Sequence, residues 1–261
     1  MKMTTAETAK ENYTFRLNNT LKLINSGRER DDYFYDVALY HRQIGILKLL
    51  MDVDQQGFVD GMCKSAYSRL YFLRNFAPKN SVEAPYLCLS KDVAITAGLA
   101  AGHVELAKQI AEHSPKKHDP KVEYEDDFLF MRFMADSILS GTTEDNLRKL
   151  VARWEVVLEG GESAEFAVCK SIADNDVDKF TDTFDLLIAS RQQQLKQWRE
   201  SMSFDEEMHS AEGFLYIKGM CLLRIAQLRG IPVKDEYPLV PRMALQLTNV
   251  TFPGEDSWRA P

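Results

Sequence analysis

Residues 33–50 read YFYDVALYHRQIGILKLL, and the apolar side chains in this stretch recur every three or four residues. That spacing places them along one face of an α-helix. A second stretch, residues 58–73, repeats the pattern after a short break. The two stretches therefore predict two neighbouring helices whose apolar faces pack together. The residues that form these two faces are Phe34, Val37, Ala38, His41, Ile44 and Leu47, followed by Val59, Met62, Cys63, Ala66, Leu70 and Leu73.

The distribution of proline extends this prediction to the rest of the chain. The 261 residues include nine prolines, and none occurs before Pro78 or between Lys121 and Ile231. Because proline interrupts a helix, both proline-free stretches favour long helical segments. We therefore expect an all-α fold of about ten helices, packed as antiparallel hairpins and solenoid-like in part.

Two irregular regions are expected among these helices. The segment 114–123 contains two prolines among charged residues, and it is the clearest linker in what we expect to be a single domain, 1–261. It is also the place where that domain could divide. Residues 231–261 hold five prolines and predict an irregular tail with a short helix at Arg242–Leu247. Just before the tail, the apolar spacing predicts one continuous helix from about Met208 to Leu228.

One short segment is similar to part of a known repeat. Residues 97–108, AGLAAGHVELAK, look like the helical hairpin of an ankyrin unit, with a turn at Gly102 and His103. The companion β-turn motif is missing and nothing recurs at a fixed period. The segment predicts a helical hairpin, and whether it has a function of its own stays open.

The charge balance limits the kinds of partner. The chain has 32 Lys and Arg against 39 Asp and Glu, which gives a net charge of −7. Proteins that bind nucleic acid need a basic face to neutralise phosphates, so we expect no nucleic-acid partner. A basic protein is a better electrostatic match, because opposite fields accelerate association. The alternative is that the negative charge only keeps the protein soluble.

The cysteines and the N-terminal residues favour a cytoplasmic location. The four cysteines, Cys63, Cys88, Cys169 and Cys221, are far apart, and no pair has the spacing of a metal or redox site. Buried thiols in a reducing compartment are the expected state. The polar residues 1–12 do not resemble a signal peptide, and no apolar run suggests a membrane span.

Acidic residues gather at two places that are candidates for binding a partner. Five aspartates from 174 to 185 fall at the ligand positions of a calcium loop, but Lys179 replaces the glycine that the loop's sharp turn requires. The apolar stripe of a helix also continues through the segment, so we expect an acidic helix start and no metal. Near residue 31, acids alternate with aromatic residues. The candidate residues are Asp174, Asp176, Asp178, Asp182, Asp185, Asp31, Asp32, Tyr33 and Tyr35.

No linear motif for catalysis is present. The segment Glu206–His209 contains one Glu-x-x-His, but a di-iron site in a helical bundle needs two copies. No zinc-protease signature, phosphate-binding glycine loop or nucleophile elbow occurs in the sequence. We therefore expect a protein that is not an enzyme and that has no cofactor. An enzyme whose residues are scattered along the chain remains an alternative.

The C-terminal third resembles the end of a known family. Residues 212–231, EGFLYIKGMCLLRIAQLRGI, form an apolar helix that closes on Arg-Gly-Ile, and residues 237–242, YPLVPR, follow. This arrangement resembles the end of the immunity protein 49 family, all-helical bacterial proteins that are encoded beside polymorphic toxins. The helix pair over 33–50 and 58–73 is compatible with that family.

The resemblance implies an antitoxin that binds a cognate secreted toxin and blocks its active site, in competition between bacteria. It implies no catalytic residues. The expected partner is a basic toxin of the nuclease type, which an acidic inhibitor would meet quickly. A helical-repeat adaptor or regulatory module with a different protein partner remains the alternative.

Overall fold

A computed structural model describes residues 4–91 and 93–261. Throughout these residues the regular elements are helical, and the only β-type contact is an isolated bridge between Tyr237 and Val240. The predicted all-α fold is confirmed. The α-helices are α1 (Thr5–Asn25), α2 (Asp31–Asp52), α3 (Gln55–Tyr71), α4 (Ala84–Leu87), α5 (Val93–Ala100), α6 (Val104–His113), α7 (Glu125–Ile138), α8 (Glu144–Val157), α9 (Ala164–Asp174), α10 (Val177–Arg199), α11 (Glu206–Glu212), α12 (Ile217–Leu228) and α13 (Arg242–Leu245).

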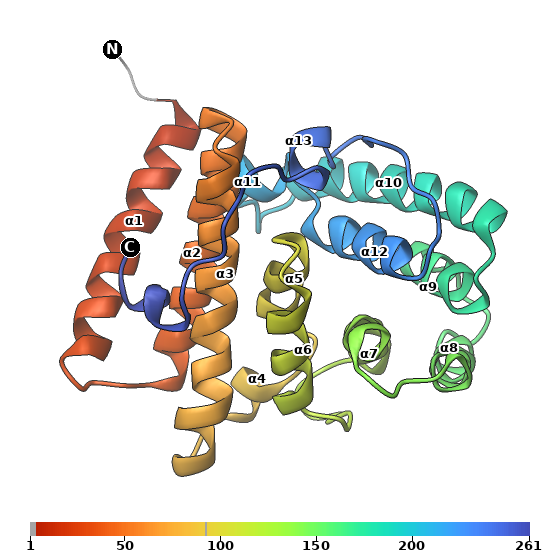
Figure 1. Ribbon diagram of the computed structural model, residues 1–261, viewed down its shortest axis with the longest axis horizontal. Helices are drawn as coiled ribbons and strands as arrows, with labels where there is room; N and C mark the ends of the chain where they lie inside the picture. The colour runs from red at the N-terminus through yellow and green to blue at the C-terminus, as the bar shows by residue number, and fades with distance from the viewer. Residues whose placement is uncertain (1–3, 92) are drawn as a thin grey trace.

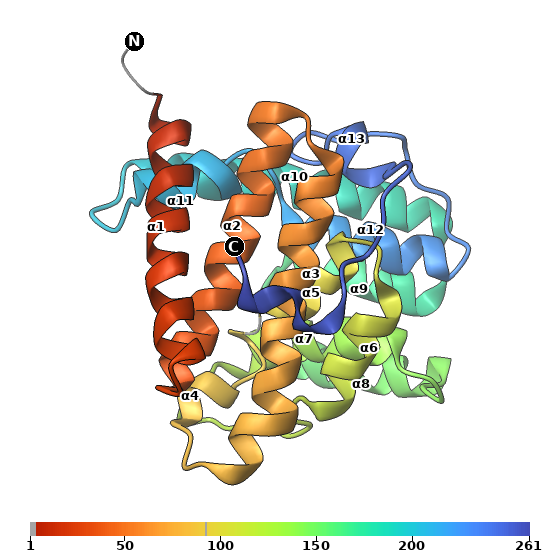
Figure 2. The same cartoon turned by 60° about the vertical axis from the view of Figure 1, so that its left-hand side comes forward.

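The helices form three neighbouring groups (Figure 1). Helices α1, α2 and α3 stand side by side at one end, the pair α5 and α6 lies in the middle, and α7 to α10 with α12 make up the other end. Helix α11 belongs to the second half of the chain but packs against α1 and α2, as the turned view shows (Figure 2). The fold therefore joins segments that are distant in sequence.

Helices α2 and α3 approach each other more closely than side chains normally allow. The Cα of Gly61 in α3 lies so near Gly45 that a Cβ on Gly61 would be 2.7 Å from the Gly45 Cα and 2.7 Å from the His41 carbonyl oxygen. Two glycines that face each other let the helix backbones touch. This contact fixes the separation of the two helices that carry the predicted apolar faces.

Helices α5 and α6 form the hairpin predicted for residues 97–108. Gly102 makes the turn with a φ of +75°, and the His103 side chain caps α6 by accepting a hydrogen bond from the Leu106 amide at 3.3 Å. A Cβ on Gly98 would lie 3.3 Å from the Ala107 side chain, so the two helices pack closely. The hairpin rests on α3 and α12.

The segment 114–123 is non-helical and tied to its surroundings. The buried Ser114 hydroxyl donates to the Ile110 carbonyl at 2.8 Å, and the Glu123 carboxylate accepts a hydrogen bond from the Ser90 amide at 2.8 Å. Beyond the segment, α12 packs against α5 and α7. The buried apolar side chains of the described residues form one cluster that includes both sides of the segment.

The C-terminal tail runs back along α3 toward α1, with α13 as its short helix (Figure 1). Side-chain amides of Gln55 and Gln56 hold it by donating to the carbonyls of Met243 and Thr251 at 2.7 and 2.9 Å. Near its end, the Trp258 ring is 1% exposed and packs against Phe34 and Tyr71. The tail therefore completes the core.

The helix predicted over residues 208–228 is in fact two helices, α11 and α12. The chain leaves helical geometry between Gly213 and Tyr216. The Tyr216 amide donates to the carbonyl of Leu239 in the tail at 2.8 Å, so it takes no part in the hydrogen-bond ladder of a continuous helix. The helix predicted from local spacing is therefore interrupted by a hydrogen bond to Leu239, which lies 23 positions later in the chain.

The four cysteines are buried free thiols, as predicted. Burial raises the pKa of the Cys63 thiol to about 12, and the Asp60 carboxylate adds to this shift. In the described part of the chain, no helix combines the length and apolar character that a bilayer crossing requires.

The contact between α2 and α3 predicts that Gly61→Ala destabilises the protein. The new methyl group would overlap the α2 backbone, which cannot move without separating the helices, so we expect a net loss of about 1–3 kcal/mol in the free energy of unfolding. Urea denaturation measures this. Gly254→Ala is the control, because nothing lies within 4 Å of its Cβ position. Equal stabilities for the two variants would contradict the close approach.

His41 predicts a pH dependence of stability. Its Nε2–H donates to the Trp258 carbonyl at 2.9 Å, and burial lowers its pKa from 6.5 to about 3. Between about pH 3 and pH 6.5 the imidazole is therefore protonated in the unfolded chain and neutral in the folded chain. The contribution of this residue to the free energy of unfolding is complete above pH 6.5 and decreases as the pH falls through this range. Between pH 7 and pH 4 we expect this residue to remove on the order of 3 kcal/mol. His41→Gln should flatten that dependence in urea denaturation, and an unchanged pH slope would contradict it.

Candidate functional site

The five aspartates from 174 to 185 lie at the turn between α9 and α10. Asp174 is the last residue of α9, Asn175 is left-handed with a φ of 53°, and the Asp176 side chain caps α10 by accepting from the Lys179 amide at 3.1 Å. Helix α10 then runs without interruption to Arg199, so the helix start that the sequence predicted is confirmed. Within residues 4–91 and 93–261, no group of three or more His, Cys, Asp or Glu side chains is arranged so that it could hold a metal ion.

Neighbouring cations neutralise much of this aspartate cluster. Lys179 lies 2.9 Å from Asp176, Lys234 lies 2.8 Å from Asp185, and Arg148 lies 3.8 Å from Asp174. The hydrogen bond from Lys179 lowers the pKa of the Asp176 carboxyl. Five carboxylates with three cations among them leave an excess of two negative charges.

The predicted residues at the start of α2 are also engaged within the protein. Arg30 forms a bidentate ion pair with Asp32 at 2.8 and 2.9 Å, and its guanidinium lies 5.0 Å from the centre of the Tyr33 ring. Asp31 accepts a hydrogen bond from the Glu83 amide at 3.0 Å, and the Tyr35 ring packs edge-on against Tyr86. The start of α2 and the α9–α10 turn lie on opposite sides of the molecule (Figure 1), so the structure does not bring the two predicted sets together.

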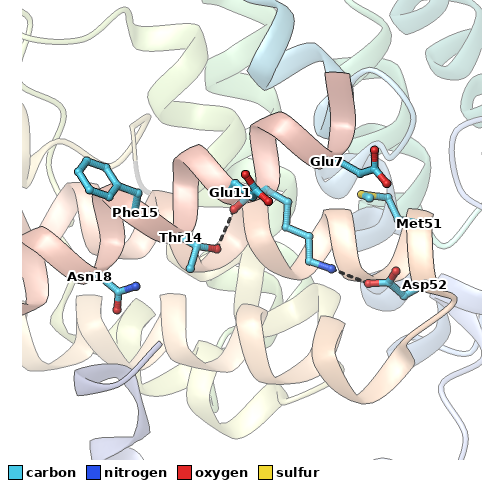
Figure 3. Close-up of a pocket in the computed structure, with 8 residues that line it drawn as sticks. Glu7, Glu11, Thr14, Phe15, Asn18, Met51 and Asp52 are labelled. Carbon is cyan, nitrogen blue, oxygen red and sulfur yellow. Dashed lines mark hydrogen bonds and ion pairs between the residues drawn. The ribbon is translucent and has the colours of Figure 1, made fainter. Parts of the chain in front are cut away.

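A third acidic region, which was not among the candidates predicted from the sequence, lies on α1 and the end of α2. A hollow of about 610 Å³ is lined there by charged and polar side chains around one exposed aromatic ring. Figure 3 shows these side chains along α1, from Glu7 to Asn18, and at the last turn of α2. We call this region the Phe15 surface; it consists of Glu7, Lys10, Glu11, Thr14, Phe15, Asn18, Met51 and Asp52.

The Phe15 surface combines an exposed ring with excess negative charge. Phe15 is 68% exposed, whereas Tyr13 and Leu17 on the opposite face of α1 are buried. Lys10 pairs with Asp52 at 2.6 Å (Figure 3), and the two further carboxylates, Glu7 and Glu11, have no cation within ion-pair distance among residues 4–91 and 93–261. The Glu7 carboxylate accepts a hydrogen bond from the Thr4 amide at 2.7 Å as part of the α1 cap. The Glu11 carboxylate makes no hydrogen bond and no ion pair to any described residue.

Carboxylates from α11 contact a different face of α1 from the Phe15 surface. Arg16 lies 2.9 Å from Glu207, and the Thr5 hydroxyl donates to Glu206 at 3.2 Å. Burial raises the pKa of the Tyr13 phenol, and the nearby charges of Asp205 and Glu207 raise it further.

Local spacing carried a signal for this surface. Positions 7, 10, 11, 14, 15 and 18 recur at three and four residues and so share one face of α1. Phe15 stands roughly 200° around the helix from the buried Tyr13. An aromatic residue on the polar face of an amphipathic helix is therefore the readable sign of an exposed contact.

Comparison with known proteins adds no relative. No family model, no curated protein and no solved structure matches the chain. The geometry of its own surfaces is therefore the basis for any function proposed for it.

Phe15→Ala should not change the stability of the fold. Its ring is 68% exposed, so we expect a change within about 0.5 kcal/mol in the free energy of unfolding, measured by urea denaturation. The matched control is Leu17→Ala on the same helix, where the buried side chain leaves a cavity and should cost about 2–5 kcal/mol. A large loss in Phe15→Ala would mean that the ring serves folding and would remove it as a candidate contact.

Proposed function

We propose that the protein is an immunity protein that binds a basic cognate toxin and blocks its active site. The Phe15 surface is the observation that carries this proposal. It offers an exposed aromatic ring, a hollow of about 610 Å³ and three carboxylates against one ammonium. Aromatic side chains with polar surroundings are favoured at the centres of protein interfaces, and the net charge of −7 favours a cationic partner.

A lysine or arginine of the toxin fits this surface chemically. Its aliphatic stem would pack on Phe15 and Met51, and its charged end would face Glu11 and Glu7. A cation close to the Phe15 ring gains a further cation–π contribution. Because Glu11 has no partner of its own among the described residues, binding breaks no existing ion pair there.

Inhibition follows if the toxin's basic groups line its active cleft. Carboxylates on a rigid helix would then occupy the place of the toxin's anionic substrate, and the bulk of the helical bundle would exclude that substrate. This mechanism needs no catalysis and no cofactor in the immunity protein, and it involves neither nucleic acid nor a membrane. It places the protein in the cytoplasm of the cell that makes the toxin.

The alternative is a helical-repeat adaptor that uses the same surface for another basic protein. The α5–α6 hairpin, with its repeat-like sequence, favours this reading. An adaptor would bind without neutralising a toxin, so a test of protection separates the two functions. An enzyme without a linear motif is the remaining alternative.

Protection from a toxin encoded by the adjacent reading frame tests the proposal. Co-expression of the full chain should restore growth to cells that make this toxin. Glu11→Lys should slow association at low salt by on the order of tenfold, because it replaces an attractive charge with a repulsive one. Asp178→Lys is the matched comparison, since Asp178 is also an exposed carboxylate on a helix with no ion pair to a described residue.

The outcomes separate the candidate surfaces and functions. If Asp178→Lys slows association and Glu11→Lys does not, the aspartate cluster is the interface and the Phe15 surface is wrong. If the adjacent protein binds but cells still die, an adaptor is favoured over an immunity protein. Absence of both binding and protection would contradict the proposed function.

A further inference from the structure

Three cationic side chains from three helices line one polar hollow inside the molecule. Arg42 comes from α2, Arg191 from α10 and Lys218 from the first turn of α12. The hollow has a volume of about 200 Å³, and Glu165, Gln194 and Glu212 also line it. It lies away from the Phe15 surface and shares no residue with it.

Lys218 is the central group of this region. Its ammonium makes no hydrogen bond and no ion pair within residues 4–91 and 93–261, and its only recorded contact is the Phe130 ring, 5.3 Å from the nitrogen. Burial is the main cause that lowers the pKa of the Lys218 ammonium, and the charges of Arg42 and Arg191 lower it further. The carboxylates of Asp127 and Glu165 partly offset this by raising the pKa. A partly buried ammonium with no carboxylate of the described residues within ion-pair distance is costly to the fold, so a function would explain it.

The two arginines also have unused hydrogen-bonding capacity. Arg42 is 7% exposed and pairs with Glu212 at 3.0 Å, but Gln43 donates to the same carboxylate oxygen at 2.7 Å. The buried Nε atoms of both arginines lack a partner among the described residues. Arg191 makes no ion pair there; its guanidinium lies 5.3 Å from the centre of the Tyr216 ring.

The start of α12 adds backbone donors to the same hollow. Tyr216 precedes the helix and gives it no side-chain cap, and Tyr216, Ile217 and Lys218 all line the hollow. The first amides of a helix have no acceptor within it, and their dipoles favour a negative charge. The break between α11 and α12 creates this helix start, which a continuous helix would not have.

Donors therefore exceed acceptors in the hollow. Two carboxylates, Glu165 and Glu212, face three cations and the uncapped end of α12, and one oxygen of Glu212 is already engaged by the ion pair with Arg42 and the hydrogen bond from Gln43. We propose that this hollow is a binding site for a small oxyanion, a phosphate or carboxylate group held by Lys218, Arg191 and the first turn of α12. Helix starts with nearby basic side chains bind such groups elsewhere.

A larger ligand that carries the anionic group has room to extend. Lys218 also lines an adjacent hollow of about 640 Å³, together with Lys91, Lys121 and Tyr124. The lysines there match a second negative charge on the same molecule. Asp127 and Glu123 line that hollow as well, so its charge is mixed and the anion is best held on the Arg191 side.

Calorimetric titration of the full chain with inorganic phosphate tests the site, with malonate in a second titration to separate phosphate from carboxylate. Ionic strength is held constant with sodium chloride. We expect saturable binding of at least one of the two anions at concentrations up to about 20 mM. Lys218→Met should weaken it at least about tenfold. Arg153→Gln is the control, because Arg153 is exposed and pairs with Glu125 at 2.7 Å on the surface.

Thermal unfolding without ligand gives a second measurement. Lys218→Met removes a partly buried charge that has no ion pair to a described residue and replaces it with an unbranched apolar side chain, so the melting temperature should rise while the stabilisation by the anion disappears. Equal stabilisation of the parent chain and Lys218→Met by phosphate would indicate a general salt effect and overturn the proposal. So would the absence of saturable heat with both anions. Neither result depends on the toxin, so failure here leaves the Phe15 surface untouched.

Discussion

The backbone contact between Gly45 and Gly61 sets the position of α2, and most of the structure depends on that helix. Helix α2 lies between α1 and α3 and also contacts α11. Its first half carries Phe34, which receives the Trp258 ring of the tail, and its middle carries Arg42, which reaches the polar hollow at α12. Its last turn supplies Met51 and Asp52 to the Phe15 surface. A shift of α2 would therefore alter the core, the hollow and the surface together, since packed interiors transmit displacements.

Charge has different consequences at the two regions that we assign to ligands. At the Phe15 surface the carboxylates are exposed, so water and salt weaken their field and their main effect is on the rate at which a partner arrives. At Lys218 the charge is partly buried, so its main effect is on affinity and on the stability of the protein without a bound anion. The aspartate cluster has a similar excess of negative charge, but residues 174–185 contribute no exposed aromatic ring, and for this reason the cluster is the weaker candidate for a protein interface.

The sequence allowed the helices to be predicted wherever local spacing and local turns determine them. The apolar stripes of α1, α2, α3 and α10 were readable, as was the turn at Gly102. The break before α12 was not, because it depends on the Leu239 carbonyl in a distant tail. The polar hollow combines residues 42, 191 and 218, which no linear pattern connects. The exposure of Phe15 could have been predicted from its position on the polar face of α1. Composition and net charge alone do not show it.

The central claim is that this protein acts through the Phe15 surface on a basic protein partner. Hydrogen–deuterium exchange of the full chain, with and without the protein encoded by the adjacent reading frame, tests that claim directly. It measures the protection of backbone amides along all the helices in one experiment. The account predicts slower exchange in the first half of α1 and the last turn of α2, with the α9–α10 turn unchanged. Protection confined to the α9–α10 turn, or none in α1, would contradict it.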